Sequence, residues 1–476
     1  MLPSCTGWKI QTNPGIKRSM RPISPDRIKM LLGSSTSIRV FGSWLSIGKI
    51  IMLCNILLAL YNFMCFTASR GLSVPCIVVL NNSGLHDAAE KQLARTTEPR
   101  DSTVLTKMKI GALAIQRIPA YRLEHRGSFI ILGDYVKANG EQPEFNQSIT
   151  YTTQATHEFL FPHVEELCKR WEGPVSISVY APGSDLAIVN RKIAHLLKCA
   201  PCVANHVTFH VVYHRSHVPP NIPTDPKQYV QSQDVNCTNL QPHDTGNYRK
   251  DANLTYPINV LRNAARLRAQ TKYVLASDIE LYPSANIISR FIQMVSNDSA
   301  PRSVYTLPIF EIEKGYPVPR EKRELQDLYK QKQAIFFHRF VCDQCQNFPL
   351  RDRWINTTPN NASMLSVFVT TKRRRDRSSW EPIYIGTNDE PLYAEELSWE
   401  GKRDKMSQMF ELCLIDYDFK VLNDAFLCHA PGIKKLIKEE LAWRSKFVRQ
   451  NNAMYKRIMS RIKAKHPNGV KPHRCI

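Results

Sequence analysis

The chain has 476 residues, with 64 Lys and Arg side chains against 42 Asp and Glu, and its formal net charge is +22. A charge of this size favours an anionic partner. No nucleic-acid-binding motif is recognisable, so we expect no nucleic acid among the partners. The remaining interpretations are an anionic membrane surface, an anionic substrate or an acidic glycan.

The N-terminal region predicts a membrane anchor. Residues 1–49 form a basic tail with eight Lys or Arg side chains against a single Asp, a net charge of +7. Residues 50–69 contain no charged side chain, and 20 residues of helix cross ~30 Å of hydrocarbon. The positive-inside rule places the tail in the cytosol and the rest of the chain in the lumen. The alternative, a cleaved signal peptide, is disfavoured because the apolar run begins some 50 residues into the chain.

The rest of the chain divides into a stem and a globular body. Residues 70–145 lack sustained periodicity and are predicted to be a stem and the segment that leads into the body. The body, 146–476, is predicted to begin with the segment 149–157. Further strands are predicted at 175–180, 207–213, 273–275 and 304–310, and helices at about 161–170, 258–269, 320–333, 405–415 and 434–463. Strands that alternate with helices predict one α/β domain with a covered, mostly parallel sheet.

Two carboxylates follow the predicted strand at 273–275. Asp278 and Glu280 are two residues apart, so in extended backbone they point to the same side, and Pro283 ends the strand pairing just beyond. Two carboxylates at the carboxyl end of a buried strand can hold a hard divalent cation with open positions for phosphate oxygens. The alternative is a surface turn with two solvated acids, because so short a motif recurs by accident.

Glycosylation signals and cysteines agree with a lumenal setting. Residues 70–476 contain ten cysteines, an even number that permits full pairing in an oxidising compartment. Cys199-x-x-Cys202 and Cys342-x-x-Cys345 could form a zinc site, but their wide separation in sequence favours disulfides, with the pairing left open. The basic run 372–375 is interpreted as a solvated loop. The N-x-Ser/Thr acceptor sites are Asn81, Asn146, Asn236, Asn253, Asn297, Asn356 and Asn361.

Several stretches of the body carry a resemblance to a known family. They are Trp171-Glu-Gly-Pro-Val-Ser, Tyr256-Pro-Ile-Asn-Val-Leu-Arg-Asn-Ala-Ala-Arg266, Asp278-Ile-Glu-Leu-Tyr-Pro-Ser284, Trp380-Glu-Pro-Ile-Tyr384 and Val421-Leu-Asn-Asp-Ala-Phe-Leu-Cys-His429. In these stretches the chain resembles glycosyltransferase family 49, over about residues 145–476. The resemblance implies a GT-A-type fold, a single-pass type II anchor in the Golgi membrane, a divalent metal and a UDP-sugar donor.

The resemblance also implies a reaction and partners. The implied reaction is inverting transfer of glucuronate from UDP-glucuronate to a xylose-terminated glycan on an O-mannosylated, dystroglycan-like glycoprotein. Association with other glycosyltransferases is a further expected partnership. Two departures concern the donor and acceptor: Glu280 stands where the family motif has a second Asp, and Ala394 follows Pro391-Leu-Tyr393 where the family tends to have Asp. The alternatives are therefore another donor, UDP-xylose or UDP-N-acetylglucosamine, or a non-catalytic lumenal binding protein.

A divalent ion needs a third protein ligand beside Asp278 and Glu280. The resemblance places a histidine ligand at His429, which follows the strand-like segment 421–427; the alternative is a structural histidine. Imidazole together with carboxylates suits Mn²⁺ better than Mg²⁺ or Ca²⁺, so we expect Mn²⁺ as the cofactor.

The remaining candidate residues concern substrate binding and proton transfer. Asn259 and Arg262 are candidate nucleotide contacts, with helix capping and surface pairing as the alternative. Lys405 is a candidate for neutralising the diphosphate, and Arg266 or Lys405 for binding the glucuronate carboxylate. Inversion requires one general base to deprotonate the acceptor hydroxyl. Asp389, in the loop that follows Gly386, is favoured for that role over Glu311, which is also a candidate substrate contact, and Glu395.

Overall fold

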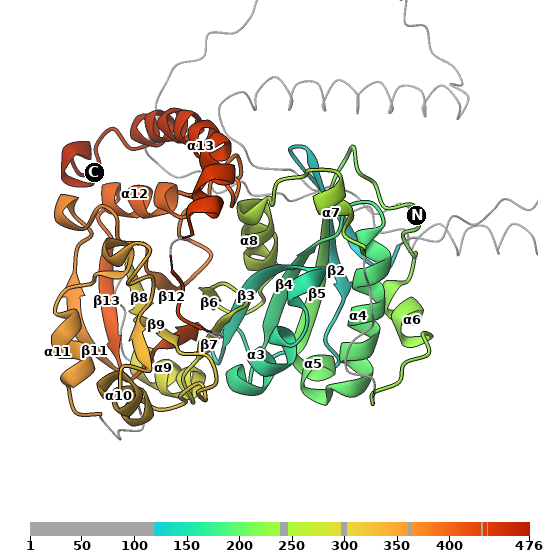
Figure 1. Cartoon of the computed structure of the whole chain (residues 1–476), viewed down its shortest axis with the longest axis horizontal. Helices are drawn as coiled ribbons and strands as arrows, with labels where there is room; N and C mark the ends of the chain where they lie inside the picture. Colours follow the sequence, from blue (N-terminus) through green and yellow to red (C-terminus); the bar gives the residue numbers. More distant parts are fainter. Residues whose placement is uncertain (1–118, 239–245, 297–301, 360–363, 430–431, 436) are drawn as a thin grey trace, which may run out of the picture. The chain divides into compact units, whose positions relative to one another are not determined.

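The computed structural model describes residues 119–238, 246–296, 302–359, 364–429, 432–435 and 437–476 (Figure 1). These residues belong to one compact unit, Gly111–Ile476. The predicted tail, anchor and most of the predicted stem lie outside them. None of the helices in the described residues combines the length and the apolar character that crossing a membrane requires.

A ten-stranded mixed sheet forms the centre of the fold, in the order β1-β2-β5-β4-β3-β6-β12-β8-β13-β11. The strands β5, β4, β3 and β6 run parallel, β12 runs antiparallel to both of its neighbours, and β13 is parallel to β8. The strands are β1 (Arg122–Arg126), β2 (Phe129–Val136), β3 (Ile149–Thr156), β4 (Val175–Tyr180), β5 (Val207–His214), β6 (Tyr273–Ala276), β8 (Ser303–Leu307), β11 (Ser366–Thr371), β12 (Ile383–Gly386) and β13 (Asp418–Asn423).

The folded body begins earlier than predicted. β1 and β2 lie in the segment 70–145, which was interpreted as a stem, yet they form one edge of the sheet. β2 is buried along nearly its whole length, because its two faces pack in two different hydrophobic clusters. Its apolar run is too short for periodicity to identify.

A second, four-stranded sheet gathers segments that are far apart in the sequence. Its order is β10-β9-β14-β7, and β14 pairs in parallel with β9 and antiparallel with β7. The predicted strand at 304–310 is in fact two strands in different sheets, because Pro308 between them has no N–H for a ladder. The strands are β7 (Leu281–Pro283), β9 (Ile309–Ile312), β10 (Ala334–Phe336) and β14 (Leu427–His429).

The helices predicted from the sequence are present, with ends shifted by a few residues, together with helices that were not predicted. The α-helices are α3 (His163–Trp171), α4 (Asp185–Cys199), α5 (Pro201–His206), α6 (Pro226–Gln231), α7 (Tyr248–Asp251), α8 (Ile258–Leu267), α9 (Ile287–Val295), α10 (Lys322–Lys330), α11 (Arg351–Asn356), α12 (Met406–Leu414) and α13 (Lys438–Lys465). Short 3₁₀ turns occur at His157–Phe159, Asp343–Gln346, Arg375–Arg377 and Pro472–Arg474.

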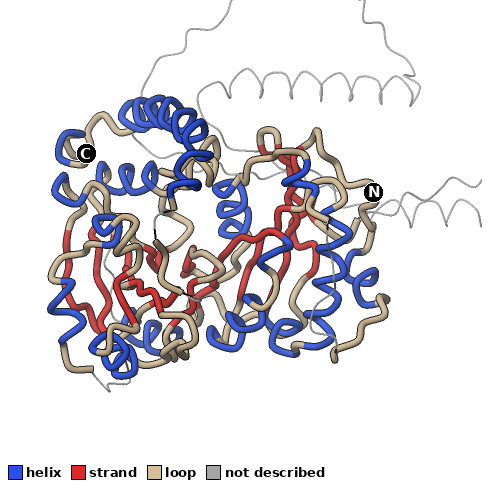
Figure 2. The backbone as a smooth tube through the Cα atoms, in the orientation of Figure 1, coloured by secondary structure: helices blue, strands red, loops and turns tan. Residues whose placement is uncertain are grey.

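Helices cover both faces of the parallel strands (Figure 2). Ile131, Tyr180 and Val212 pack on one face with the apolar side of α8. The residues next to them in sequence, such as Val179 and Val211, belong to the core that includes α3 and α4. Successive side chains of a strand point to opposite faces, so two covered faces explain the near-continuous apolar runs. The predicted covered α/β sheet is therefore confirmed, although its outer strands are antiparallel.

Four disulfides stabilise the described part of the chain. Cys199 and Cys202 each pair with a different cysteine, so neither CxxC segment forms a zinc site and the preference for disulfides is confirmed. Cys428 is a free, buried thiol, so the full pairing that the even count permitted does not occur. Cys76 lies outside the described residues. The bonds are Cys168–Cys202, Cys199–Cys237, Cys342–Cys345 and Cys413–Cys475.

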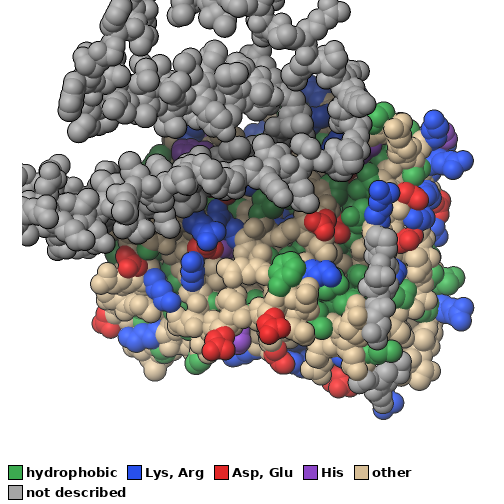
Figure 3. Space-filling model, turned by 180° about the vertical axis from the view of Figure 1, so that it is seen from behind, with side chains coloured by type: hydrophobic (Ala, Val, Ile, Leu, Met, Phe, Trp, Pro, Cys, Tyr) green, Lys and Arg blue, Asp and Glu red, His purple; other side chains and the backbone are tan. Residues whose placement is uncertain are grey.

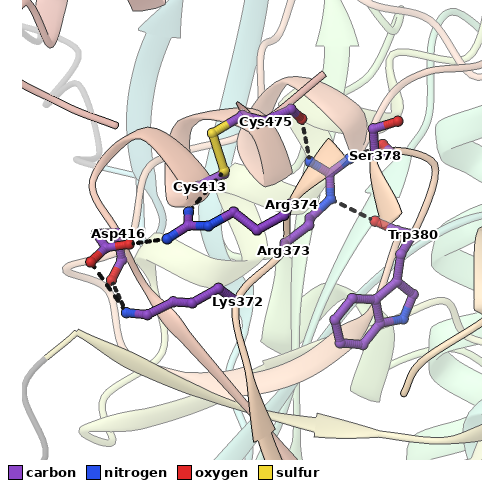
Figure 4. The surroundings of a disulfide bond; sticks show 8 residues. All are labelled: Lys372, Arg373, Arg374, Ser378, Trp380, Cys413, Asp416 and Cys475. Atoms are coloured by element: carbon purple, nitrogen blue, oxygen red, sulfur yellow. Dashed lines mark hydrogen bonds and ion pairs between the residues drawn. A yellow bond between two sulfur atoms is a disulfide. The ribbon is translucent and has the colours of Figure 1, made fainter. Parts of the chain in front are cut away.

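The basic run 372–375 is not a solvated loop. Arg373 is 1% exposed, and its guanidinium donates to the backbone carbonyls of Trp380, Cys475 and Ser378 (Figure 4). The residues on either side of Arg373, Lys372 and Arg374, form ion pairs with Asp416. The burial of Arg373 therefore depends on tertiary contacts, including one with the C-terminal segment. Composition alone indicates a solvated surface for this run.

Candidate functional site

Buried polar side chains lie level with the carboxyl end of β6. The hydroxyls of Thr152 on β3, which pairs with the last residue of β6, of Ser178 on β4 and of Ser277 after β6 have no hydrogen-bond partner among the described residues. Buried polar groups without a partner indicate a place where water or a ligand supplies one. In open α/β sheets, ligands bind in the crevice outside the carboxyl ends of the strands. This edge of the sheet is therefore the candidate site.

Asp278 is the centre of this edge. Its Oδ1 accepts hydrogen bonds from Arg262 Nη2 at 2.9 Å and Gln154 Nε2 at 2.8 Å, and its Oδ2 accepts one from Lys405 Nζ at 3.2 Å. Burial alone would raise the pKa of Asp278, but Lys405 and Arg262 hold it well below its usual range. Tyr151 donates to the Asp278 carbonyl at 3.0 Å, which fixes the turn after β6. Asp278 is thus an ionised carboxylate between two cations.

Residues of α8 hold the segment that carries Lys405. Arg262 forms an ion pair with Asp404, and Asn259 donates to the carbonyls of Asp404 and Ala394 at 2.8 Å each. Both α8 side chains are buried, which rules out the surface-pairing alternative. They position the residues around Asp278 from inside the protein, and a direct nucleotide contact by either one stays a prediction.

Glu280 and His429 form a second pair beside Asp278. His429 Nε2 lies 3.9 Å from Glu280 Oε2, and the histidine is 3% exposed. Neither ring nitrogen of His429 has a hydrogen-bond partner among the described residues. Burial would raise the pKa of Glu280, but His429 and Lys434 lower it. His429 is the last residue of β14 and pairs with Leu281 of β7. The four-stranded sheet therefore brings His429 close to the segment that follows Asp278.

The fit of a metal ion to this region is partial. Among the described residues, no group of three or more His, Cys, Asp or Glu side chains is arranged to hold a metal ion. A buried imidazole with unsatisfied nitrogens beside a carboxylate nonetheless offers donors that Mn²⁺ accepts. Asp278 differs, because cations already bind both of its oxygens. Glu280 and His429 thus fit a metal site, and the three-ligand set with Asp278 stays a prediction.

Two other predicted residues bind neighbouring segments of the protein. Glu311 is fully buried and accepts hydrogen bonds from the backbone N–H groups of His338 and Lys434, both at 3.2 Å. Burial raises its pKa. Glu395 accepts from Asn263 Nδ2 at 2.7 Å and from Arg126 at 2.9 Å. Both carboxylates are therefore engaged within the protein.

The structure places Asp389 away from Asp278. Gly386 at the end of β12 pairs with Val274 at the start of β6, so the loop that follows β12 lies at the amino end of β6, whereas Asp278 follows its carboxyl end. Arg266 of α8 binds the same loop, because it donates to the carbonyls of Thr387, Glu390 and Pro391 at 2.7 to 3.0 Å. The geometry therefore gives no support to Asp389 as the base or Arg266 as a donor contact.

Two residues of the Asp278 cluster were not predicted. Gln154 contacts Asp278 from β3, and the signal for it is the polar sequence Thr-Thr-Gln in a strand that is buried throughout. Glu381 is the second. Burial raises its pKa to about 7, against the opposing effect of Lys405, and Asp404 raises it further. Glu381 lies in the stretch Trp380–Tyr384 that resembles the family, but its coupling to Lys405 and Asp404 exists only in three dimensions.

Comparison with known proteins identifies the class. The family described as "Glycosyl-transferase for dystroglycan" matches residues 148–467. The chain therefore belongs to this family, and it is a glycosyltransferase, as the resemblance to family 49 predicts.

Individual relatives refine the comparison. Beta-1,4-glucuronyltransferase 1 of Danio rerio is 30% identical over 361 residues, 73% of this chain and 82% of the relative. The Homo sapiens protein of the same name is 29% identical over 322 residues, 66% of this chain and 74% of the relative. Xylosyl- and glucuronyltransferase LARGE2 of Mus musculus is 24% identical over 279 residues, 57% of this chain and 33% of the relative.

A solved structure is similar only at a low level. The crystal structure of GalNAc-T7 with UDP, GalNAc and Mn²⁺ aligns with a TM-score of 0.32 and 10% identity, over 64% of this chain and 49% of that one. Similarity at this level adds nothing to the assignment, which comes from the sequence family.

Proposed function

We propose that the chain is a GT-A-type, Mn²⁺-dependent, inverting glucuronyltransferase. It transfers glucuronate from UDP-glucuronate to a xylose-terminated glycan on an O-mannosylated, dystroglycan-like glycoprotein. The observation that carries the proposal is the ionised Asp278 between Arg262 and Lys405, next to the Glu280–His429 pair, at the carboxyl edge of the sheet. The relatives named as glucuronyltransferases support the choice of sugar.

The cationic side chains of the Asp278 cluster suit an anionic donor. Lys405 and Arg262 present two positive charges at the edge where the diphosphate of a UDP-sugar would lie. Lys405 keeps its charge, because Asp278 raises its pKa against the opposing effect of burial. A fixed cation that faces the departing diphosphate stabilises the negative charge that develops there. The unpartnered hydroxyl of Ser277 directly precedes Asp278, where it would hydrogen-bond the nucleotide.

Glu280 and His429, with Asp278, would hold Mn²⁺ in this proposal. When bound, the ion supplies Lewis-acid stabilisation of the UDP leaving group. The Glu280 departure from the family motif keeps a carboxylate 3.9 Å from His429, which supports a functional ligand pair. At the other departure, Ala394, the contact with Asn259 uses the backbone carbonyl, so it does not depend on the side chain. Neither departure therefore favours the non-catalytic alternative.

Inversion also needs a base at the acceptor hydroxyl, and we assign it to Glu381. A general base works best when its pKa lies near the operating pH, and burial raises the pKa of Glu381 to about 7. The charges of Lys405 and Asp404 both affect the pKa of Glu381, which supports a role close to the Asp278 cluster. Asp389, which the sequence favours, lies beyond the opposite end of β6 and remains the alternative.

The proposed cellular setting rests on features of the sequence and on the disulfides. The basic tail, the uncharged segment 50–69 and the acceptor sites for N-glycosylation support a single-pass type II protein of the Golgi membrane with a lumenal catalytic body. The four disulfides agree with an oxidising compartment. The partners are then a UDP-sugar, a glycoprotein glycan, the membrane and other glycosyltransferases.

A donor panel tests the proposal. Full-length protein is incubated with Mn²⁺, a β-xyloside acceptor and, in turn, UDP-glucuronate, UDP-xylose and UDP-N-acetylglucosamine, beside an Asp278→Asn control. Transfer from UDP-glucuronate alone supports the full proposal. Transfer from only another donor keeps the metal and fold statements and rejects the glucuronyl assignment. No transfer from any donor by the folded protein would favour a non-catalytic role.

A further inference from the structure

A cavity of about 480 Å³ lies between α13, the start of α12 and the loop after Arg373. Figure 1 shows α12 and α13 together at the end of the molecule that also carries the C-terminus. Four cationic side chains line the cavity, with serine hydroxyls beside them, and no Asp or Glu side chain does. We call it the basic pocket; its polar lining includes Arg373, Arg403, Lys456, Lys463, Ser378 and Ser460.

The cations of the basic pocket have no carboxylate partners, unlike their neighbours. Elsewhere on α13, Arg461 pairs with Glu396 at 2.6 Å and Lys465 pairs with Glu411 at 2.7 Å. No Asp or Glu among the described residues forms an ion pair with any of the four cations. Ion pairs therefore do not neutralise the positive charge of the basic pocket. On the face that Figure 3 shows, by contrast, Lys and Arg side chains are interspersed with Asp and Glu.

The burial of Arg373 makes the unpaired positive charge of the basic pocket energetically unfavourable. Its side chain is almost fully buried, and its guanidinium is held by three backbone carbonyls (Figure 4). Burial lowers its pKa to about 10, so the group stays charged at neutral pH. Tyr455 and Glu381 raise the pKa of Arg373, but less than burial lowers it, so the buried charge is only partly compensated. An anion in the adjoining cavity would supply that compensation.

The side chains of the other three cations are exposed, so a ligand can contact them. Arg403 is held over the ring of Tyr455 at 5.2 Å, on backbone with a φ of 61°. Lys456 and Lys463 are exposed and lie seven residues apart, two turns of helix, so they point to the same side of α13. Guanidinium and ammonium groups that converge on one space with hydroxyls are donors suited to an oxyanion.

We propose that the basic pocket binds a tetrahedral oxyanion, a phosphate or sulfate group, either as a free ion or as an ester on a glycan. This is a second anion site, separate from the Asp278 cluster. Arg403 directly precedes Asp404 and Lys405, which contact Arg262 and Asp278, so the two sites lie on one continuous segment. A phosphate or sulfate ester on the acceptor would be held here while another part of the same glycan lies at the donor site.

Calorimetric titration of the full chain tests the proposal, with inorganic phosphate, inorganic sulfate and a hexose phosphate at fixed ionic strength. We expect saturable binding to the wild type, and a loss of about tenfold in affinity in the Lys456→Gln/Lys463→Gln variant, which removes two charged hydrogen-bond donors. The matched control is Arg449→Gln/Arg457→Gln. It removes two exposed charges from the same helix, and neither residue lines the pocket.

The outcomes distinguish a free oxyanion from an ester on a glycan, and they also show whether the proposal fails. Tighter binding of the hexose phosphate than of inorganic phosphate supports an ester on a glycan, and equal binding supports the free ion. Absence of saturable binding to the wild type, or equal weakening in both double variants, overturns the proposal. Both variants change only exposed side chains, and their thermal midpoints check that they fold. Because no donor is present, the result is independent of the transfer reaction.

Discussion

Lys405 Nζ lies 3.2 Å from Oδ2 of Asp278, a residue 127 positions earlier in the chain. The contact joins the turn after β6 to the segment before α12, and Arg262 of α8 secures both ends by binding Asp278 and Asp404. The carboxylate is therefore ionised and fixed before any ligand arrives. Prearranged charges of this kind stabilise a transition state without reorganisation at the moment of reaction.

Replacement of Lys405 tests the role of this contact. Lys405→Gln removes the cation that faces the leaving diphosphate, so we expect kcat to fall roughly a hundredfold, the size of the loss of one prearranged electrostatic partner. The measurement is steady-state transfer from UDP-glucuronate. Lys402→Gln is the control, since it removes an exposed charge from the same segment. Equal activity of the two variants would contradict a role of Lys405 in stabilising the leaving diphosphate.

Glu280 and His429 are predicted to set the affinity for Mn²⁺. In Glu280→Gln, the Mn²⁺ concentration for half-maximal activity should rise by at least about tenfold, the loss seen even when an outer-shell partner of a metal is removed. His429→Ala should behave in the same way. Glu280→Asp restores the acid that is usual in the family, and it should keep Mn²⁺ activation close to that of the wild type. An unchanged Mn²⁺ requirement in Glu280→Gln and His429→Ala would contradict the ligand assignment.

The pH dependence of kcat should report Glu381. A base acts in its deprotonated form, and its pKa is raised to about 7, so activity should rise as pH increases through about 7 and level off above it. Glu381→Gln should lower kcat by 10²-fold to 10⁴-fold, roughly the contribution of general-base catalysis, and should abolish this limb. Asp389→Asn should leave the limb in place. The opposite pattern in the two variants would return the base to Asp389.

The Cys413–Cys475 disulfide is predicted to secure the C-terminal segment on α12. Replacing both cysteines with Ala should lower the free energy of unfolding by about 2–4 kcal/mol, the usual effect of a native disulfide. Because the carbonyl of Cys475 accepts from Arg373, the basic pocket should lose order as well. Cys428→Ala, which removes a buried thiol and no disulfide, is the comparison. Denaturant unfolding of the three proteins measures the difference, and equal stability of wild type and double variant would refute the prediction.

Much of the sheet and part of the site could be predicted from local patterns. The apolar run before Asp278 and the helix with Arg262 are local features, and both are present where predicted. The split of 304–310 at Pro308 was missed because two apolar halves read as one strand. Whether an acid lies in the site depends on the direction of the strand before it. β12 runs antiparallel to β6, so the loop with Asp389 lies away from Asp278, and no local sequence pattern shows this direction.

Local sequence patterns do not predict the burial of charged residues either. Arg373 stands in a run of four basic residues, and its guanidinium is held by the carbonyls of Ser378 and Trp380 in the following loop and of Cys475 at the C-terminal end. Gln154 and Glu381 acquire their importance from partners more than 20 residues away. Sequence patterns identify the elements, whereas the pairing of charges between elements requires the structure.

The central claim, that the Asp278 cluster transfers glucuronate, is tested most directly by product analysis. Full-length wild-type protein and Asp278→Asn are incubated with UDP-glucuronate, Mn²⁺ and a β-xyloside, and the linkage of the product is determined by NMR. We predict a β-linked glucuronate product that needs Mn²⁺ and is lost in Asp278→Asn. An α-linked product, or the same yield from Asp278→Asn, would contradict the account.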